Sequence, residues 1–266
     1  MPTVPVLLYH SVRGGPGAAE SKWQVRADDF KASMELVLAS GRMVLTAERY
    51  ARWLRDGCPP NSRPILITFD DGFADFADVV VPILEDLGLR ATLFLTSGWI
   101  GKRGMLSKRA IRDLDPSRVE VGAHSVSHRH LDLLSDRGAG DEIRVSRVTL
   151  EELLGREVTS FAYPHGSHHR LTKEIVRAAG FTTAHAVKNA FSHAADDRFA
   201  IARFAVTSRT QRSRIGEVID GRGLPLGWPG ERLRTRVYRS YRWLSNGCGY
   251  ATRRSALPSS PTAKED

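Results

Sequence analysis

Residues 65–73 read Ile65-Leu66-Ile67-Thr68-Phe69-Asp70-Asp71-Gly72-Phe73, an apolar run that ends in two adjacent acids and a glycine. The run predicts a buried strand. Each ionised carboxylate at its end must be solvated or paired, which makes the pair costly to fold around. In α/β proteins, ligand-binding residues gather at the carboxyl ends of strands. The alternative is an ordinary Asp-Asp-Gly turn, because Asp and Gly are frequent turn residues.

Predicted strands and helices alternate along the chain. Apolar runs predict strands at residues 4–10, 65–69, 91–96, 119–123, 158–163, 181–186 and 199–206. Helical periodicity predicts helices over 28–41, 46–55, 75–87 with a restart near Pro82, 107–114, 141–154 and 171–179. This alternation implies parallel βαβ units, and roughly seven strands predict a barrel or near-barrel.

Composition limits the class of protein. The chain has 266 residues, of which 41% are hydrophobic, enough for a sizeable core. Its two cysteines, Cys58 and Cys248, fit neither a disulfide framework nor a thiolate metal cluster. There is no basic leader at the start and no run of about 20 apolar residues. We therefore expect a cytoplasmic protein.

The net charge of +9 is concentrated near the C-terminus. Eight arginines and one acid, Glu231, lie between Arg222 and Arg254. We therefore divide the chain into a catalytic barrel (1–220), a basic, aromatic-containing extension (221–254) and a disordered tail (255–266), which is polar and contains two prolines.

Two further strand ends supply metal-ligand chemistry. His124-Ser125-Val126-Ser127-His128 places two imidazoles four residues apart, which on one helical turn would face the same way. With Asp71 they would complete the two-histidine, one-carboxylate set of catalytic zinc sites. Asp70 would then be free to act as a general base on water. Taken alone, each histidine pattern also fits a polar loop.

The same residues resemble a known family. Thr68-Phe69-Asp70-Asp71-Gly72 and the His124–His128 stretch are similar to the first two motifs of the polysaccharide deacetylases, carbohydrate esterase family four. The resemblance covers about residues 4–210. It implies a distorted (β/α)7-type barrel in a single catalytic domain, which removes N-acetyl groups from amino sugars. It further implies Asp70 as the base, and Asp71, His124 and His128 as ligands of a divalent metal, usually zinc.

The third family motif, Arg-x-Pro-Tyr followed by Gly, is altered here. The chain reads Ala162-Tyr163-Pro164-His165-Gly166, which keeps the proline and glycine but replaces the arginine by alanine and the tyrosine by histidine. The resemblance implies that the His165 backbone N–H stabilises an oxyanion, with Tyr163 and Pro164 at the substrate. Arg203 is the candidate to replace the arginine that orients the base, or it forms a surface or rim salt bridge.

The last family motif, Leu-x-His, occurs at the start of the chain as Leu8-Tyr9-His10. This order resembles the circularly permuted branch of the family, which includes the poly-N-acetylglucosamine deacetylases. The resemblance implies that His10 is the general acid that protonates the leaving amine. Taken alone, a histidine at a strand end also fits a hydrogen-bonded core residue.

The remaining sequence features concern partners. The stretch 232–244 mixes arginines with Leu, Val, Tyr and Trp, a composition that suits an anionic membrane surface. We expect an amino-sugar or glycan substrate, with a lipid- or diphosphate-linked sugar at the inner membrane face as one hypothesis. A solvated helix packed on the barrel is the alternative. Trp23 and Trp99 either stack on the sugar or pack in the fold.

Two other functions stay open on sequence alone. One is a catalytically inactive carbohydrate-binding relative, and the other is a nucleic-acid-binding protein, suggested by the basic extension. No nucleic-acid fold signature is present in the sequence, so we expect no nucleic-acid partner.

Overall fold

The computed structural model describes residues 3–14, 21–57, 59 and 61–227, which all belong to one compact unit, Met1–Pro229. The predicted tail and all but the first seven residues of the predicted basic extension lie outside these residues. Among the described residues, no helix has the length and apolar character needed to cross a bilayer.

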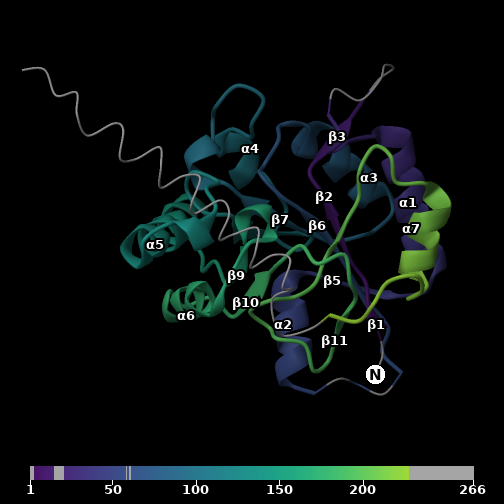
Figure 1. The fold of residues 1–266 in the computed structure, drawn as a ribbon. Coiled ribbons are helices and arrows are strands. Elements are labelled where there is room, and N and C mark those ends of the chain that lie inside the picture. Colours follow the sequence, from purple (N-terminus) through teal and green to yellow (C-terminus); the bar gives the residue numbers. More distant parts are fainter. Residues whose placement is uncertain (1–2, 15–20, 58, 60, 228–266) are drawn as a thin grey trace, which may run out of the picture. The chain divides into compact units, whose positions relative to one another are not determined.

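A mostly parallel sheet forms the centre of the unit (Figure 1). Its strand order is β10-β9-β8-β7-β6-β2-β12, with β5 also paired to β6. The strands are β2 (Val6–Tyr9), β5 (Met43–Leu45), β6 (Pro64–Phe69), β7 (Ala91–Leu95), β8 (Val119–Ala123), β9 (Ser160–Ala162), β10 (Thr183–His185) and β12 (Phe204–Ala205). The sheet curls into a half-barrel, and a parallel bridge joins His185 of β10 to Ile201, three residues before β12. The predicted α/β barrel class is confirmed.

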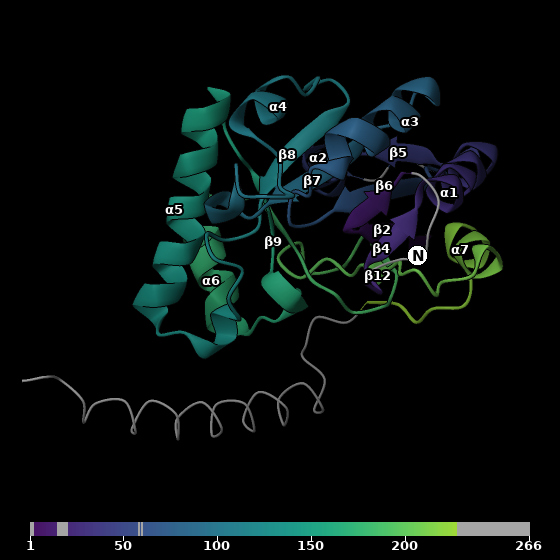
Figure 2. The same ribbon diagram turned by 90° about the horizontal axis from the view of Figure 1, so that it is seen from above.

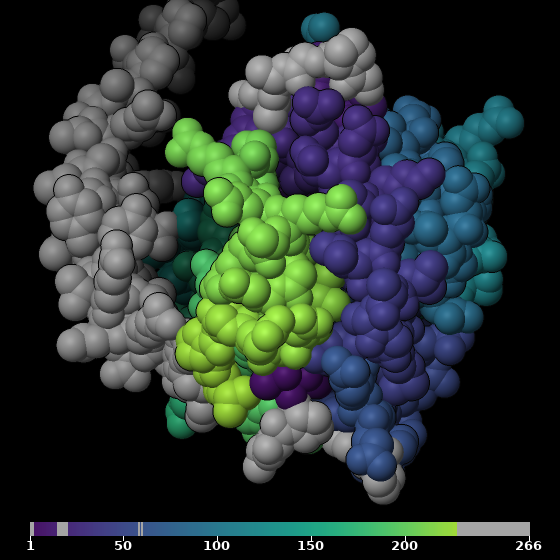
Figure 3. All heavy atoms as spheres, turned by 90° about the vertical axis from the view of Figure 1, so that its right-hand side faces the viewer, coloured from purple at the N-terminus to yellow at the C-terminus, as the bar shows by residue number. Residues whose placement is uncertain are grey.

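Helices flank the sheet (Figures 1 and 2). They are α1 (Ala27–Ala39), α2 (Ala47–Arg55), α3 (Val81–Asp86), α4 (Lys108–Arg112), α5 (Asp136–Leu154), α6 (Arg170–Ala178) and α7 (Arg212–Ile219). The pair α5 and α6 lies beyond the β10 edge of the sheet, and α1 and α7 lie beyond the β12 edge. Figure 3 shows α7 against α1 on that second side.

Short elements complete the unit. They are the strand pairs β1 (Thr3–Val4) with β11 (Ser192–His193) and β3 (Ser11–Arg13) with β4 (Gln24–Arg26), the π-helix η1 (Phe76–Val80), and the 3₁₀ turns η2 (Ser97–Trp99), η3 (Leu131–Leu133) and η4 (Pro164–Gly166). The restart predicted near Pro82 corresponds to the junction of η1 with α3, where proline occupies the first turn.

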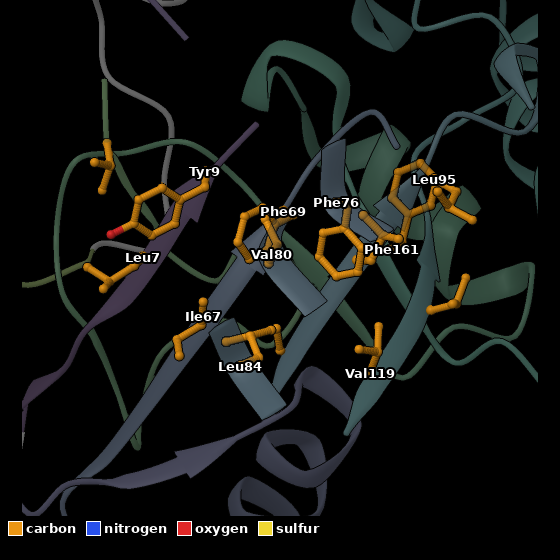
Figure 4. Packing of buried hydrophobic residues seen from close by; sticks show 14 of the residues in the cluster. Leu7, Tyr9, Ile67, Phe69, Phe76, Val80, Leu84, Leu95, Val119 and Phe161 are labelled. Atoms are coloured by element: carbon orange, nitrogen blue, oxygen red, sulfur yellow. The ribbon is translucent and has the colours of Figure 1, made fainter. Parts of the chain in front are cut away.

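The core lies between the sheet and its helices (Figure 4). All six residues of β6 are buried. Their side chains alternate between two faces, as in any strand. Ile67 and Phe69 belong to the main core, where Phe69 packs on Tyr9 with ring centroids 5.5 Å apart and on Phe76 at 5.0 Å. The other face of β6 carries Thr68 into the barrel and ends at Asp70.

Strand register brings the functional strand ends together. Tyr9 pairs with Phe69, so that His10 and Asp70 follow side by side, and Asp70 N–H donates to Tyr9 O at 3.0 Å. On the other side, Leu95 pairs with Ala123, which places His124 one residue beyond β8. Because these strands are parallel, their carboxyl ends share one rim, as the sequence predicts.

Two predicted elements differ most from the structure in their boundaries. Helix α5 begins at Asp136 instead of residue 141, because the Ser135 hydroxyl caps it by accepting from Gly138 N–H at 3.2 Å. The two glycines in its first turns hid this start. Strand β12 has two residues, whereas the predicted strand covered 199–206, because most of that apolar stretch is buried without ladder pairing.

Candidate active site

Asp71, His124 and His128 form a cluster in which the ligand atoms lie within 4.8 Å of one another. Asp71 Oδ1 is 3.6 Å from His124 Nε2 and 3.2 Å from His128 Nε2. This oxygen is buried and has no hydrogen-bond partner within the described structure. A buried carboxylate oxygen without a partner is costly. The three residues therefore fit a bound cation, which would satisfy the oxygen.

His124 is oriented as a metal-binding histidine. Its Nδ1 lies 2.8 Å from Ala162 O, a carbonyl that can only accept, so Nδ1 carries the proton and Nε2 presents a lone pair towards Asp71. Burial lowers the pKa of His124, against the opposing charges of Asp70 and Asp71. The neutral imidazole is the form that binds a metal.

The 124–128 stretch is a loop and not the helical turn expected from the histidine spacing. Ser125 and His128 adopt left-handed conformations, with φ of 63° and 58°. Asp71 does the same at 76°. Such values are uncommon for residues with side chains and persist only where the surroundings enforce them. The two imidazoles converge because the backbone reverses, a geometry that spacing alone does not reveal.

The next position, Gly72, is required by its surroundings. Its φ is +92°, and a Cβ there would lie 2.4 Å from the Leu95 side chain. Only glycine fits this turn without displacement. The motif that ends in Asp71-Gly72 is thus needed for the shape of the rim as well as for its chemistry.

Glu142 on α5 fastens the histidine loop. Its carboxylate accepts hydrogen bonds from Val126 N–H at 2.9 Å and Ser127 N–H at 2.8 Å, and from the Ser127 hydroxyl. This residue was not predicted from the sequence, because a glutamate in a helix gives no signal that it binds loop residues 15 and 16 positions away. These hydrogen bonds join Glu142 to the part of the loop between the two histidines.

Asp70 is bound by a buried arginine. Both guanidinium Nη atoms of Arg203 lie 2.7 Å from the two carboxylate oxygens, and Arg203 Nε donates to Ala186 O at 3.1 Å. Arg203 has 0% of its surface exposed, so the pair is not a surface salt bridge. Burial alone would raise the pKa of Asp70, but the charges of Arg203 and then His124 outweigh it and lower that pKa. Asp70 is therefore ionised at neutral pH.

His10 lies beside the two acids at the end of β2. Its ring packs against Trp23, with centroids 4.6 Å apart, and its buried Nδ1 has no partner within the described residues. Burial lowers the pKa of His10, while the charges of Asp70 and Asp71 act to raise it. Trp99 packs on His128 in a similar way at 5.1 Å. Each of the two tryptophans thus contacts a site histidine.

The turn at residues 163–166 is a further part of the site. Tyr163 is fully buried and donates its hydroxyl hydrogen to Phe199 O at 2.9 Å, and Pro164 is also buried. His165 is exposed, has a φ of 58° and stacks on His130 with centroids 3.8 Å apart. A Cβ at Gly166 would lie 2.5 Å from Val187 N, which explains why this glycine is kept.

The nine residues predicted for the site therefore gather at one rim. Tyr163, Pro164 and Arg203, which were predicted to bind substrate, have buried side chains in this structure. Arg203 contacts Asp70, and Tyr163 anchors its turn. We propose that Arg203 and Tyr163 act by positioning other residues of the site.

Replacing Arg203 with methionine should lower the free energy of unfolding by about 3–5 kcal/mol, because a buried carboxylate loses its partner. Urea denaturation would measure the change. Arg109→Met, which breaks an exposed pair with Asp113, is the control and should cost about 0–1 kcal/mol. The double variant Asp70→Asn/Arg203→Met should recover part of the loss. A single variant as stable as the parent would contradict the account of this pair.

Glu142→Ala should weaken zinc binding by about 10–100-fold, because the strained histidine loop loses its anchor. Competition with a chromophoric chelator would measure the affinity. The control is Glu152→Ala, an exposed position on the same helix with the same change in helix propensity. Equal zinc affinity in the two variants would show that the loop holds its shape without Glu142.

Comparison with known proteins agrees with this geometry. Residues 58–184 match the family model described as "Polysaccharide deacetylase". The putative polysaccharide deacetylase YxkH of Bacillus subtilis is 23% identical over 217 residues, which cover 82% of this chain and 76% of YxkH.

Two solved structures share the fold. The Streptococcus pyogenes deacetylase PplD, determined in complex with acetate, has a TM-score of 0.76 and 21% identity, covering 82% of this chain and 99% of PplD. IcaB from Ammonifex degensii has a TM-score of 0.72 and 22% identity, covering 82% and 97%. Residues 58–184 of this chain therefore match a polysaccharide deacetylase domain.

Proposed function

We propose that the chain is a metal-dependent hydrolase that removes an N-acetyl or related N-acyl group from an amino sugar, a glycan or a glycolipid precursor. The family supports deacetylation. The observation that carries the finer proposal is the unpartnered Asp71 oxygen, which faces two imidazoles beside an ionised, arginine-bound Asp70. Two adjacent acids with only a structural role would not need an unpartnered oxygen that faces two imidazoles.

The proposed ligands are Asp71, His124 and His128. Two imidazole nitrogens and one carboxylate favour zinc among common divalent ions. When bound, such an ion supplies Lewis-acid activation of water and of the amide carbonyl. The orientation of His124 by Ala162 O and the anchoring of the loop by Glu142 support these roles.

Asp70 is proposed as the general base that takes a proton from the attacking water. Arg203 fixes both carboxylate oxygens and favours the ionised form, which a base requires. The arginine absent from the third motif would thus be replaced from the segment before β12. Its guanidinium lies on the barrel side of Asp70 and has no exposed surface.

Two groups complete the proposed mechanism. The His165 backbone N–H would donate to the oxyanion that forms as the amide carbon becomes tetrahedral. His10 would protonate the nitrogen as the C–N bond breaks, which releases acetate and a free amine. Trp23 limits the movement of the His10 ring. Burial lowers the pKa of His10, and the charges of the two acids offset part of that effect. The circularly permuted origin of this histidine stays a prediction.

Asp70→Asn should keep the metal and lower acetate release by about 10²–10⁴-fold, the usual contribution of a general base. Acetate release from N-acetylated oligosaccharides would be measured together with zinc content, and the melting temperature would show whether the variant is folded. The exposed Asp78→Asn is the control. Near-normal turnover by zinc-loaded Asp70→Asn would refute the mechanism. Absence of stoichiometric metal in the parent protein would favour the inactive carbohydrate-binding alternative.

Membrane contact is a separate part of the proposal. The arginines of residues 232–244 lie outside the described residues, and their sequence alone suggests attraction to anionic lipid or to a lipid- or diphosphate-linked substrate at the inner membrane face. The full chain should sediment with vesicles that contain phosphatidylglycerol, and less so as salt increases. Replacing Arg234, Arg236 and Arg239 with glutamine should reduce sedimentation. Equal sedimentation with neutral vesicles would remove this hypothesis.

A further inference from the structure

We propose that the substrate carries negative charge, as carboxylate or phosphate, on or beside the sugar that bears the acyl group. This inference rests on the proposed function and concerns the charged side chains around the site. We define the cationic rim as the five exposed basic residues in the loops that follow the carboxyl ends of the strands: Lys22, Lys102, Arg103, Arg129 and Arg209.

Backbone contacts connect the loops of the cationic rim to the site. The loop that carries Lys102 and Arg103 packs on the turn after Asp71, where Leu106 N–H donates to Gly72 O at 2.9 Å and Ala74 N–H donates to Gly104 O at 2.9 Å. Arg129 directly follows the ligand candidate His128.

The remaining two members lie on the His10 side. Lys22 Nζ is 4.6 Å from the Trp23 ring, which itself packs on His10. Ser208 N–H donates to Lys22 O at 2.9 Å, so Arg209 belongs to the neighbouring loop. The cations thus come from four loops on different sides of the site.

Exposed acids are absent from the described loops of the cationic rim, although Glu142 of α5 binds the histidine loop at Val126 and Ser127 N–H. Within the described part of these loops, no acid is classed as exposed: Asp132 is buried, and Asp75 is partly buried and accepts from the Ser11 hydroxyl. No ion pair involves any of the five cations across residues 3–14, 21–57, 59 and 61–227. Asp70 and Asp71 are buried in the site. Asp70 pairs with Arg203, and Asp71 faces the proposed metal.

The excess of exposed cations is confined to the site end, and the opposite end of the barrel differs from it. Its exposed loop residues carry both signs, and several form ion pairs: Asp56 with Arg55, Asp113 with Arg109, and Asp220 with Arg222. Within the described residues, the excess positive charge is therefore concentrated at the site end of the barrel and is not spread evenly over the unit.

Charge also argues against a neutral polymer of N-acetyl sugars as the preferred substrate. Deacetylation converts each such sugar into a cationic amine, which the cationic rim would repel while neighbouring residues are still being processed. An anionic glycan remains attracted, because its acidic groups offset each new amine. Focused charge of this kind raises association rates by roughly 10–10³-fold at low salt.

The test compares matched substrates with the zinc-loaded full chain. Acetate release is measured from a hyaluronan tetrasaccharide and from chitotetraose, and from N-acetylglucosamine 1-phosphate and its neutral methyl glycoside. Salt is varied from about 25 mM to about 300 mM, across which charge screening increases strongly. We expect an advantage in kcat/KM of about tenfold or more for an anionic member at low salt, falling as salt rises. The two pairs distinguish carboxylate from phosphate.

Variants locate the effect. Lys102→Gln/Arg103→Gln and Arg129→Gln should each lower kcat/KM for the anionic substrates more than for their neutral partners, so that the anionic advantage falls by about 3–10-fold. The control, Arg63→Gln/Arg156→Gln, removes two positive charges at the opposite end, as many as Lys102→Gln/Arg103→Gln, and should leave the advantage intact. Equal, salt-independent turnover of neutral and anionic substrates would overturn the inference but not the proposed function. Equal losses of the anionic advantage in the rim and control variants would have the same consequence. Release of acetate from none of the substrates would instead count against the proposed function.

Discussion

The buried ion pair between Asp70 and Arg203 is the interaction on which the rest of the site depends. Two adjacent carboxylates at the end of a buried strand repel each other and lose solvation. Arg203 satisfies both oxygens of Asp70 from within the barrel, which leaves Asp71 to turn towards the histidines. The two acids therefore differ in environment although they are neighbours in sequence. That difference underlies the proposal that one is a base and the other a metal ligand.

The site is also held by backbone strain that other contacts support. Asp71, Ser125, His128 and His165 all have left-handed φ values. Non-glycine residues in such conformations each cost of order 1–3 kcal/mol and cluster at functional sites. Here Glu142 binds the histidine loop, and Gly72 and Gly166 fill places where a Cβ would clash. A few specific contacts thus offset the backbone strain that accompanies the convergence of the polar groups.

Much of this could be predicted from sequence because it depends on local patterns. The alternation of apolar strands with helices gave the parallel barrel, and strand ends with polar residues indicated the rim. What failed were features set by tertiary contacts. The histidine spacing suggested a helical turn, whereas a strained loop forms it. Glu142 lies 15 and 16 positions from the loop residues that it binds. Arg203 lies 133 positions from Asp70, and it was a candidate partner of the base only through the family resemblance. Spacing carries no information about such contacts, and Ser135 as a helix cap was concealed by neighbouring glycines.

The central claim is that Asp71, His124 and His128 bind the metal while Asp70 stays paired with Arg203. The most direct test is an anomalous-difference map at the zinc edge from crystals of the zinc-loaded protein. The account predicts one peak about 2.0–2.2 Å from His124 Nε2, His128 Nε2 and an Asp71 oxygen, with the bidentate pair of Asp70 and Arg203 intact. A peak bound by Asp70, or by His130 and His165 in place of Asp71, would contradict it.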